Sequence, residues 1–311
     1  MSTDKLKLPA YGGQALIEGV LMRGKLGVAA AYRAPDGTVV IDKEPLGTLY
    51  KSKIARIPFL RGLILLWDSF GLGTRFLTKS ANVQGEEDEQ IEGPALYLTL
   101  AISLLIAVAL FFVGPAGLGS LIQKWTGIST LAMNLVEGLI RLALIVLYIW
   151  AIGRMKDIER VFGYHGAEHK TINAFESGAE LTPEEVQKYP LEHPRCGTSF
   201  LLSLVVISVF VFALLGQLST LWLILSRIIL IPVIAMLAYE YIRFAANHLD
   251  NPVMRWLIQP NLALQRLTTR EPSLDMLEVG IAAFNAMMAQ EAELAGTESM
   301  VVQPADSQAV A

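Results

Sequence analysis

The chain has 311 residues, of which 53% are apolar and 17% charged, and its formal net charge is −4. Soluble domains carry roughly 25% charged residues. The composition therefore excludes an ordinary soluble protein, and the acidic balance argues against a nucleic-acid partner. The single cysteine, Cys196, excludes an internal disulfide.

Residues 1–57 are predicted to form a small β-containing cytoplasmic module. Two short stretches, 28–33 and 38–42, flank the tripeptide Pro35-Asp36-Gly37. Proline, aspartate and glycine in this order favour a tight turn, so we expect the two stretches to pair as antiparallel strands. The start of the chain lacks the apolar core of a cleavable signal peptide.

Within this module, residues 12–24 (GGQALIEGVLMRG) combine glycines with the charged side chains of Glu18 and Arg23. The stretch lacks the Gly-Lys-Ser/Thr pattern of a phosphate-binding loop. Two interpretations remain open. The glycines could serve only tight turns, or Glu18 or Arg23 could face the histidine site discussed below.

Residues 58–93 are predicted to form an interfacial helix followed by an acidic linker. The stretch 57–81 is apolar but too charged to span a bilayer, so an amphipathic helix at the membrane surface fits it better. The linker, GEEDEQIEG, occupies residues 85–93.

Four apolar runs follow, and each is long enough to cross the roughly 30 Å hydrocarbon layer as a helix. They occupy residues 94–115, 131–153, 199–221 and 224–244. Glu137 and Arg141 are spaced to pair on one helix face in the second run, and a structural ion pair is the favoured interpretation. Pro232 predicts a kink in the fourth run.

The placement of lysine and arginine predicts the orientation of these runs. Residues 1–93 hold twelve basic residues and residues 154–198 hold six, whereas the loop between runs one and two holds only Lys124. We therefore expect a multi-pass protein of the cytoplasmic membrane, in contact with membrane lipids. Both termini and the 154–198 loop would be cytoplasmic.

The remaining segments are a C-terminal cytoplasmic part and a tail. Ser273 is expected to cap a helix that carries apolar residues at Leu274, Leu277, Ile281, Phe284 and Met288. The fold class is mainly α, with four transmembrane helices, the N-terminal β module and this C-terminal helix. The predicted segments are 1–57, 58–93, 94–153 (helices 1 and 2), 154–198 (loop), 199–246 (helices 3 and 4), 247–295 and 296–311 (disordered tail).

The stretch YHGAEHKTI, residues 164–172, carries the clearest chemical pattern. On a helix, His165 and His169 share a face, with Glu168 beside them. Imidazole suits zinc and other divalent metals. The nearby carboxylate could be a third ligand or a general base, as in the His-x-x-Glu-His pattern of some zinc peptidases.

Two further ligand types follow in the same loop. His193 and Cys196 lie in LEHPRCGTSF, so three of the four histidines and the only cysteine fall within residues 165–196. Glu176, two helical turns after His169, is another candidate ligand. The alternative is that the histidines cap helix ends and that His-Pro and Cys-Gly shape a turn.

Other ionisable groups are weaker candidates. Glu240 could be functional, because it lies in a membrane run, or it could simply pair with Arg243. Arg270 lies in LQRLTTREP, whose polar groups could cap a helix or line a cytoplasmic cleft. His248 is expected to be interfacial.

Five motifs together resemble the YqhQ-like bacterial membrane proteins, a family of unknown function labelled as predicted metal-dependent enzymes. The resemblance covers roughly residues 11–290, and His248 is not part of its pattern. The motifs are GGQALIEGVLMRG, YHGAEHKTINAFESG, HPRCGTSFLL, the Tyr-Glu-x-x-Arg of the fourth run and LQRLTTREP. The resemblance implies a membrane location and a metal, but no reaction.

Two functions are compatible with the sequence. In the first, His165, His169 and His193 or Cys196 hold a divalent metal, zinc by preference, and Glu168 activates water for hydrolysis of a lipid-linked or membrane-peptide substrate. In the second, the cluster is a structural metal site or hydrogen-bonded junction in a non-enzymatic assembly factor. A transporter is a third option with little support, since few ionisable residues lie within the runs.

Overall fold

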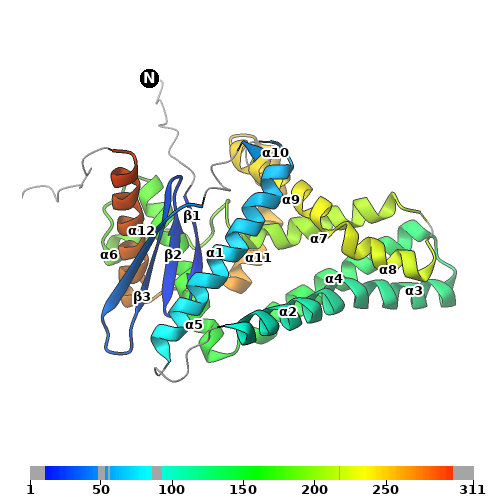
Figure 1. Cartoon of the computed structure of the whole chain (residues 1–311). Helices are drawn as coiled ribbons and strands as arrows, with labels where there is room; N and C mark the ends of the chain where they lie inside the picture. The colour runs from blue at the N-terminus through cyan, green and yellow to red at the C-terminus, as the bar shows by residue number, and fades with distance from the viewer. Residues whose placement is uncertain (1–10, 48–52, 55–56, 86–92, 217, 297–311) are drawn as a thin grey trace, which may run out of the picture.

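The computed structural model describes residues 11–47, 53–54, 57–85, 93–216 and 218–296. Within these residues, four strands form one antiparallel sheet in the order β1-β2-β3-β4 (Figure 1). The strands are β1 (Gly12–Leu16), β2 (Gly19–Arg23), β3 (Gly27–Arg33) and β4 (Val39–Pro45).

The predicted hairpin is confirmed. β3 pairs antiparallel with β4 in a register that sets Arg33 opposite Val39. The turn between them closes through a hydrogen bond from Ala34 N–H to the Thr38 carbonyl, 2.8 Å long. Gly37 takes a φ of +87°, a conformation that glycine adopts without strain.

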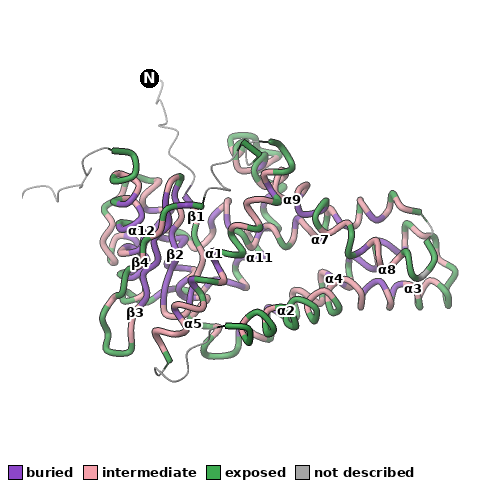
Figure 2. Tube along the Cα trace, viewed as in Figure 1, coloured by how far each residue is buried: buried purple, intermediate pink, exposed green. Residues whose placement is uncertain are grey.

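Helices cover both faces of the sheet. Alternate residues of a strand point to opposite faces, so Val20 and Met22 pack with α5 (Lys156–Glu176) and α12 (Leu274–Leu294). Their neighbour Leu21 packs on the other face, against Leu72 and Phe76 of α1 (Leu60–Gln84). Figure 2 shows buried residues concentrated along these strands.

The other long helices form an arm that extends away from the sheet (Figure 1). It contains α2 (Pro94–Val108), a π-helical segment (Ala109–Val113), α3 (Gly114–Thr126), α4 (Thr130–Ile152), α7 (Thr198–Ala213), α8 (Thr220–Ile229) and α9 (Ile231–Asn247). The shorter helices are α6 (Pro183–Val186), α10 (Pro252–Leu257) and α11 (Gln259–Thr268).

Two helical stretches of the described chain are long and apolar enough to cross a membrane, Pro94–Thr126 and Thr130–Ile152. A third is present if α8 and α9, bent by 42° relative to one another, count as one span. α7 is apolar but shorter. These helices indicate membrane association, while the number of four crossings stays a prediction.

The runs differ from the predicted ones at their ends. The first does not stop at Pro115: the helix continues to Thr126, and proline is tolerated there because it lies in the first turn of α3. The third ends at Ala213 rather than at residue 221. In the fourth, the expected bend is found, with Pro232 in the first turn of α9.

One prediction about the segments outside the arm is wrong. The predicted helix after Ser273 is present, but the Ser273 side chain makes no capping hydrogen bond. Residues 86–92 of the acidic linker and residues 297–311 of the predicted tail lie outside the described residues.

Candidate functional site

The histidine-rich site lies where the sheet and the helical arm meet. α5 supplies His165, Glu168 and His169, and the turn before α7 supplies His193 and Cys196. α5 packs on β1, while α7 and the adjacent α11 belong with the arm. The α5 side chains are therefore anchored to the sheet, whereas His193 and Cys196 are anchored to the arm.

Three ligand-type side chains converge in this site. One donor atom from each of His165, His169 and Cys196 lies within 4.8 Å of the other two. His165 Nε2 is 3.2 Å from Cys196 Sγ. The rings of His165 and His169 meet edge to face with their centroids 4.4 Å apart, as the i,i+4 spacing on α5 requires.

Backbone carbonyls fix the orientation of both rings. His165 Nδ1 lies 2.9 Å from the Thr268 carbonyl oxygen, and His169 Nδ1 lies 2.5 Å from that of Leu191. A carbonyl only accepts hydrogen bonds, so each neutral ring carries its proton on Nδ1 and presents an unprotonated Nε2. Metal-ligating histidines are commonly held in this way.

The imidazole of His169 has one nitrogen without a hydrogen bond to the described part of the chain. His169 is fully buried, and its Nε2 has no hydrogen-bond partner among the described residues. Burial lowers the pKa of His169, an effect that the nearby Cys196 partly opposes. Burial thus favours the neutral ring, whose Nε2 lies inside the protein near the Cys196 thiol.

Glu168 is also buried, beside the histidines. The backbone N–H of Gly13 in β1 donates to its carboxylate, but Oε2 has no partner among the described residues. Burial raises the pKa of the Glu168 carboxyl, and the neighbouring His165 and His193 oppose this increase. Glu168 is therefore a buried carboxyl whose protonated form is favoured by its surroundings.

His193 lies next to the three-residue group formed by His165, His169 and Cys196. Its ring centroid is 5.6 Å from that of His169, and its backbone N–H donates to Gln265 Oε1 over 2.9 Å. Burial lowers the pKa of His193 to about 4, against the effect of Glu168. The structure thus brings all four predicted ligands together, with His193 outside the closest set.

The other predicted carboxylates each form an ion pair with an arginine. Glu176 forms an ion pair with Arg195, and its Oε2 is 3.9 Å from His193 Nε2. Glu18 pairs with Arg160 and accepts from Tyr164 Oη at 3.1 Å. Arg160 lowers the pKa of Glu18.

The side chains of the remaining candidates have partners other than His165, His169 and Cys196. Arg23 pairs with Asp68 of α1 at 2.8 Å. Glu240 pairs with Arg61 of α1 rather than with Arg243. Arg270 stacks on Phe162, with 5.6 Å from its guanidinium carbon to the ring centroid. His248 is exposed and bonds its own helix at the Phe244 carbonyl.

Sequence reasoning missed the backbone groups that build the site. Thr268 and Leu191 contribute only carbonyls, for which no side-chain pattern exists. For Gly13 the sequence signal was the glycine itself. The structure explains it, because a Cβ there would lie 2.9 Å from Glu168 Cδ. Gly166 is likewise required: a Cβ would collide with the Arg270 carbonyl, which packs against α5.

Comparison with known proteins gives a family but no activity. A family model described as "Protein of unknown function (DUF1385)" matches residues 57–290. The chain is 37% identical over 308 residues to "Uncharacterized protein YqhQ" of Bacillus subtilis (strain 168), covering 94% of this chain and 96% of that protein. No solved structure matches the chain. The chain, whose long apolar helices indicate membrane association, therefore belongs to the DUF1385 family of proteins of unknown function.

Proposed function

We propose that His165, His169 and Cys196 bind a divalent metal ion and that the protein is a metal-dependent hydrolase. The observation that carries this proposal is the convergence of two carbonyl-oriented imidazoles on one thiol, with the three donor atoms within 4.8 Å. Hydrogen bonding alone gives no reason to leave His169 Nε2 buried without a partner.

The donor set suits zinc. Two nitrogens and one sulfur are common zinc ligands, with bonds of about 2.0 to 2.3 Å. In a tetrahedral site, ligand atoms are then roughly 3.3 to 3.8 Å apart. The 3.2 Å between His165 Nε2 and Cys196 Sγ is close to that spacing. Small side-chain adjustments would bring the third donor to the same distance.

Glu168 is assigned the role of general base. A bound zinc ion would supply Lewis-acid chemistry and make a nearby water easier to deprotonate. Glu168 has a buried, unpartnered oxygen and a raised pKa, so it can accept a proton and return it. The Gly13 N–H holds the carboxylate without neutralising it.

An apolar pocket along α7 and α11 supports a membrane-derived substrate. Its volume is about 970 Å³, and it is lined by α7, α9, α10 and α11, including Leu202, Phe210 and Trp256. Glu192, the neighbour of His193, lies in its wall with Arg266, and the two pair at 2.9 Å. This combination favours a lipid-linked or membrane-peptide substrate at the cytoplasmic membrane surface.

The alternative proposal is a non-enzymatic assembly factor with a structural metal. The observation that favours it is the deep burial of His193, which is only 2% exposed and adjacent to His169. A rotation of this ring would make it a fourth ligand. A closed four-ligand shell leaves no position for water and is typical of structural zinc.

Zinc X-ray absorption combined with turnover separates the two proposals. The reconstituted, zinc-loaded protein would be incubated with a panel of membrane peptides and lipid phosphoesters. A hydrolase predicts an oxygen among the zinc ligands and hydrolysis that Glu168→Gln abolishes while zinc is retained. Four protein ligands and no Glu168-dependent hydrolysis would reject the enzyme proposal and favour the assembly factor. No bound zinc would contradict both metal proposals and favour an assembly factor whose cluster is a hydrogen-bonded junction.

A further inference from the structure

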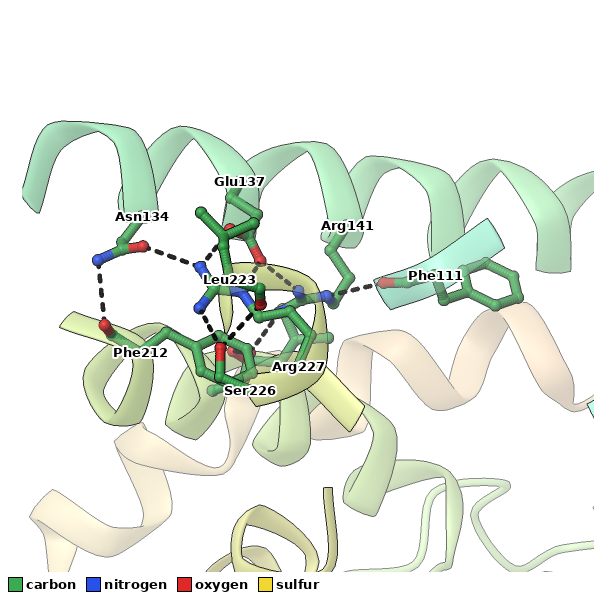
Figure 3. A network of polar contacts seen from close by, with 10 residues as sticks. Phe111, Asn134, Glu137, Arg141, Phe212, Leu223, Ser226 and Arg227 are labelled. Atoms are coloured by element: carbon green, nitrogen blue, oxygen red, sulfur yellow. Dashed lines mark hydrogen bonds and ion pairs between the residues drawn. The ribbon is translucent and has the colours of Figure 1, made fainter. Parts of the chain in front are cut away.

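A second cluster of charged residues lies inside the helical arm (Figure 3). Glu137 and Arg141 of α4 and Arg227 of α8 are 3%, 1% and 2% exposed. Arg141 Nη2 bonds Glu137 Oε1 at 2.7 Å, and Arg227 Nη2 bonds Glu137 Oε2 at 2.6 Å. The predicted pair of Glu137 and Arg141 is therefore present, but with an additional arginine.

This cluster carries an excess positive charge. Arginine stays protonated in proteins, so two guanidinium groups and one carboxylate sum to 2 − 1 = +1. The other partners of these arginines are neutral: Asn134 Oδ1, Ser208 Oγ and the Phe111 carbonyl. A buried unpaired charge is strongly unfavourable, whereas a bound anion would balance it.

A pocket gives an anion access to this charge. It has a volume of about 410 Å³ and lies between α3, α4 and α8. Arg227, Glu137 and Asn134 line it, together with the exposed Lys124 in the last turn of α3. Of the lining residues, Glu137 is the sole carboxylate, so Lys124 adds to the positive charge.

A helix N-terminus adds to the same field. Ser219, another lining residue, is the N-cap of α8, and its side chain makes no capping hydrogen bond. The first backbone N–H groups of α8 are thus left without this partner, and the N-terminus of a helix favours anions. Arg227 Nη1 also has donor capacity left, because its contact with Ser226 Oγ is 3.4 Å long.

We propose that this pocket binds a phosphate group, supplied either by an anionic lipid headgroup or by a small soluble phosphate. The pocket lies near the start of α4, whereas α5, with the histidines, follows the other end of α4 (Figure 1). The site is therefore separate from the proposed metal site and does not depend on it. Arginine, lysine and backbone N–H groups are the usual donors to phosphate.

Calorimetric titration of the full-length protein in dodecyl maltoside micelles tests the proposal. The probes are inorganic phosphate, short-chain phosphatidylglycerol and short-chain phosphatidylcholine, at fixed ionic strength. Saturable binding of inorganic phosphate would identify a soluble source. Binding of phosphatidylglycerol alone would identify a lipid source.

Two variants and one control locate the binding. Lys124→Gln removes an exposed charge, so the fold is kept, and we expect a threefold to tenfold rise in Kd, about that for losing one charged contact. Asn134→Asp is isosteric and would balance Arg227 internally, so we expect binding to fall at least about tenfold. The control, Arg154→Gln, removes an exposed charge at the other end of α4 and should leave Kd unchanged.

Three results would overturn the proposal. One is that no probe binds the wild-type protein saturably. Another is that Lys124→Gln binds as the wild type does. The third is that Arg154→Gln weakens binding as much as Lys124→Gln. If Asn134→Asp does not fold, Lys124→Gln against Arg154→Gln decides the question.

Discussion

Glu168 is held by a glycine from a distant part of the chain. Its carboxylate accepts from the Gly13 N–H, and Gly13 lacks the Cβ that would lie 2.9 Å from Glu168 Cδ. Gly12, the preceding residue, has no atom within 4 Å of its Cβ position. The two adjacent glycines therefore have different roles, and only Gly13 is required by the site.

This difference predicts the effects of two alanine substitutions. Gly13→Ala would overpack the site against Glu168 and the Leu21 carbonyl, so it should lower the free energy of unfolding by about 1 to 3 kcal/mol. Gly12→Ala should change it by less than about 0.5 kcal/mol. Thermal unfolding of the two variants checks the prediction, which equal melting temperatures would contradict.

His193 predicts a pH dependence of stability. Burial lowers its pKa from 6.5 to about 4, so between these values the unfolded chain binds a proton that the folded chain does not. Stability from this residue is present above pH 6.5 and is lost as the pH falls towards 4, by up to roughly 3 kcal/mol. The melting temperature of chelator-treated wild type should therefore fall more steeply with acid than that of His193→Gln. Parallel curves would show that His193 is not responsible.

The sequence predicted which side chains of the site come together, but not the backbone groups that orient them. The i,i+4 spacing placed His165 and His169 on one face, and the position of Cys196 just before the third apolar run led us to expect its thiol near them. The carbonyls of Thr268 and Leu191 were unpredictable, because their contacts depend on how helices pack. Glu18 was assigned no firm partner, and Arg160, which binds it, comes from one turn before the histidines on α5.

At the scale of elements, hydropathy identified the helices but not their ends. The first apolar run continues through a π-helical segment into α3, so a predicted loop is largely helical. The 42° bend between α8 and α9 agrees with the proline in the fourth run. The strand pair β3–β4 was predictable from its turn, whereas β1 and β2 required knowledge of their neighbours.

The ion pair of Arg61 with Glu240 joins α1 to α9. The side chains are 17% and 19% exposed, and Arg61 Nε lies 2.7 Å from Glu240 Oε1. A double-mutant cycle of Arg61→Gln and Glu240→Gln should give a coupling energy of roughly 0.5 to 1.5 kcal/mol. The matched cycle with the exposed Arg243→Gln should give nearly none, and the reverse order would favour the Glu240–Arg243 alternative.

At the scale of the whole molecule, one chain combines a helix-covered sheet with an apolar arm (Figure 1). The C-terminal helix α12 packs on strands from the N-terminal part, burying Phe284 against Tyr11. Composition predicted both parts but not their contact, because the amphipathic pattern of α12 does not specify its partner. The histidine site depends on this contact through α5, which α12 also packs against.

The predicted orientation is open to a direct test. After replacement of Cys196, a cysteine at the exposed Gln187 should react only with membrane-permeant reagents in intact cells. A cysteine at Trp125, which is 88% exposed in the last turn of α3, should react with impermeant reagents. The opposite labelling pattern would invert the topology and place the histidine site outside the cytoplasm.

The central claim is that His165, His169 and Cys196 bind a metal ion, and metal analysis of the purified protein tests it most directly. We expect about one zinc per chain in the wild type and in His248→Ala, which removes a histidine outside the site. His169→Ala and Cys196→Ala should each lose most of the metal while remaining folded by circular dichroism. A wild type without metal after zinc supplementation under reducing conditions would contradict the claim. Equal metal in all four proteins would also contradict it.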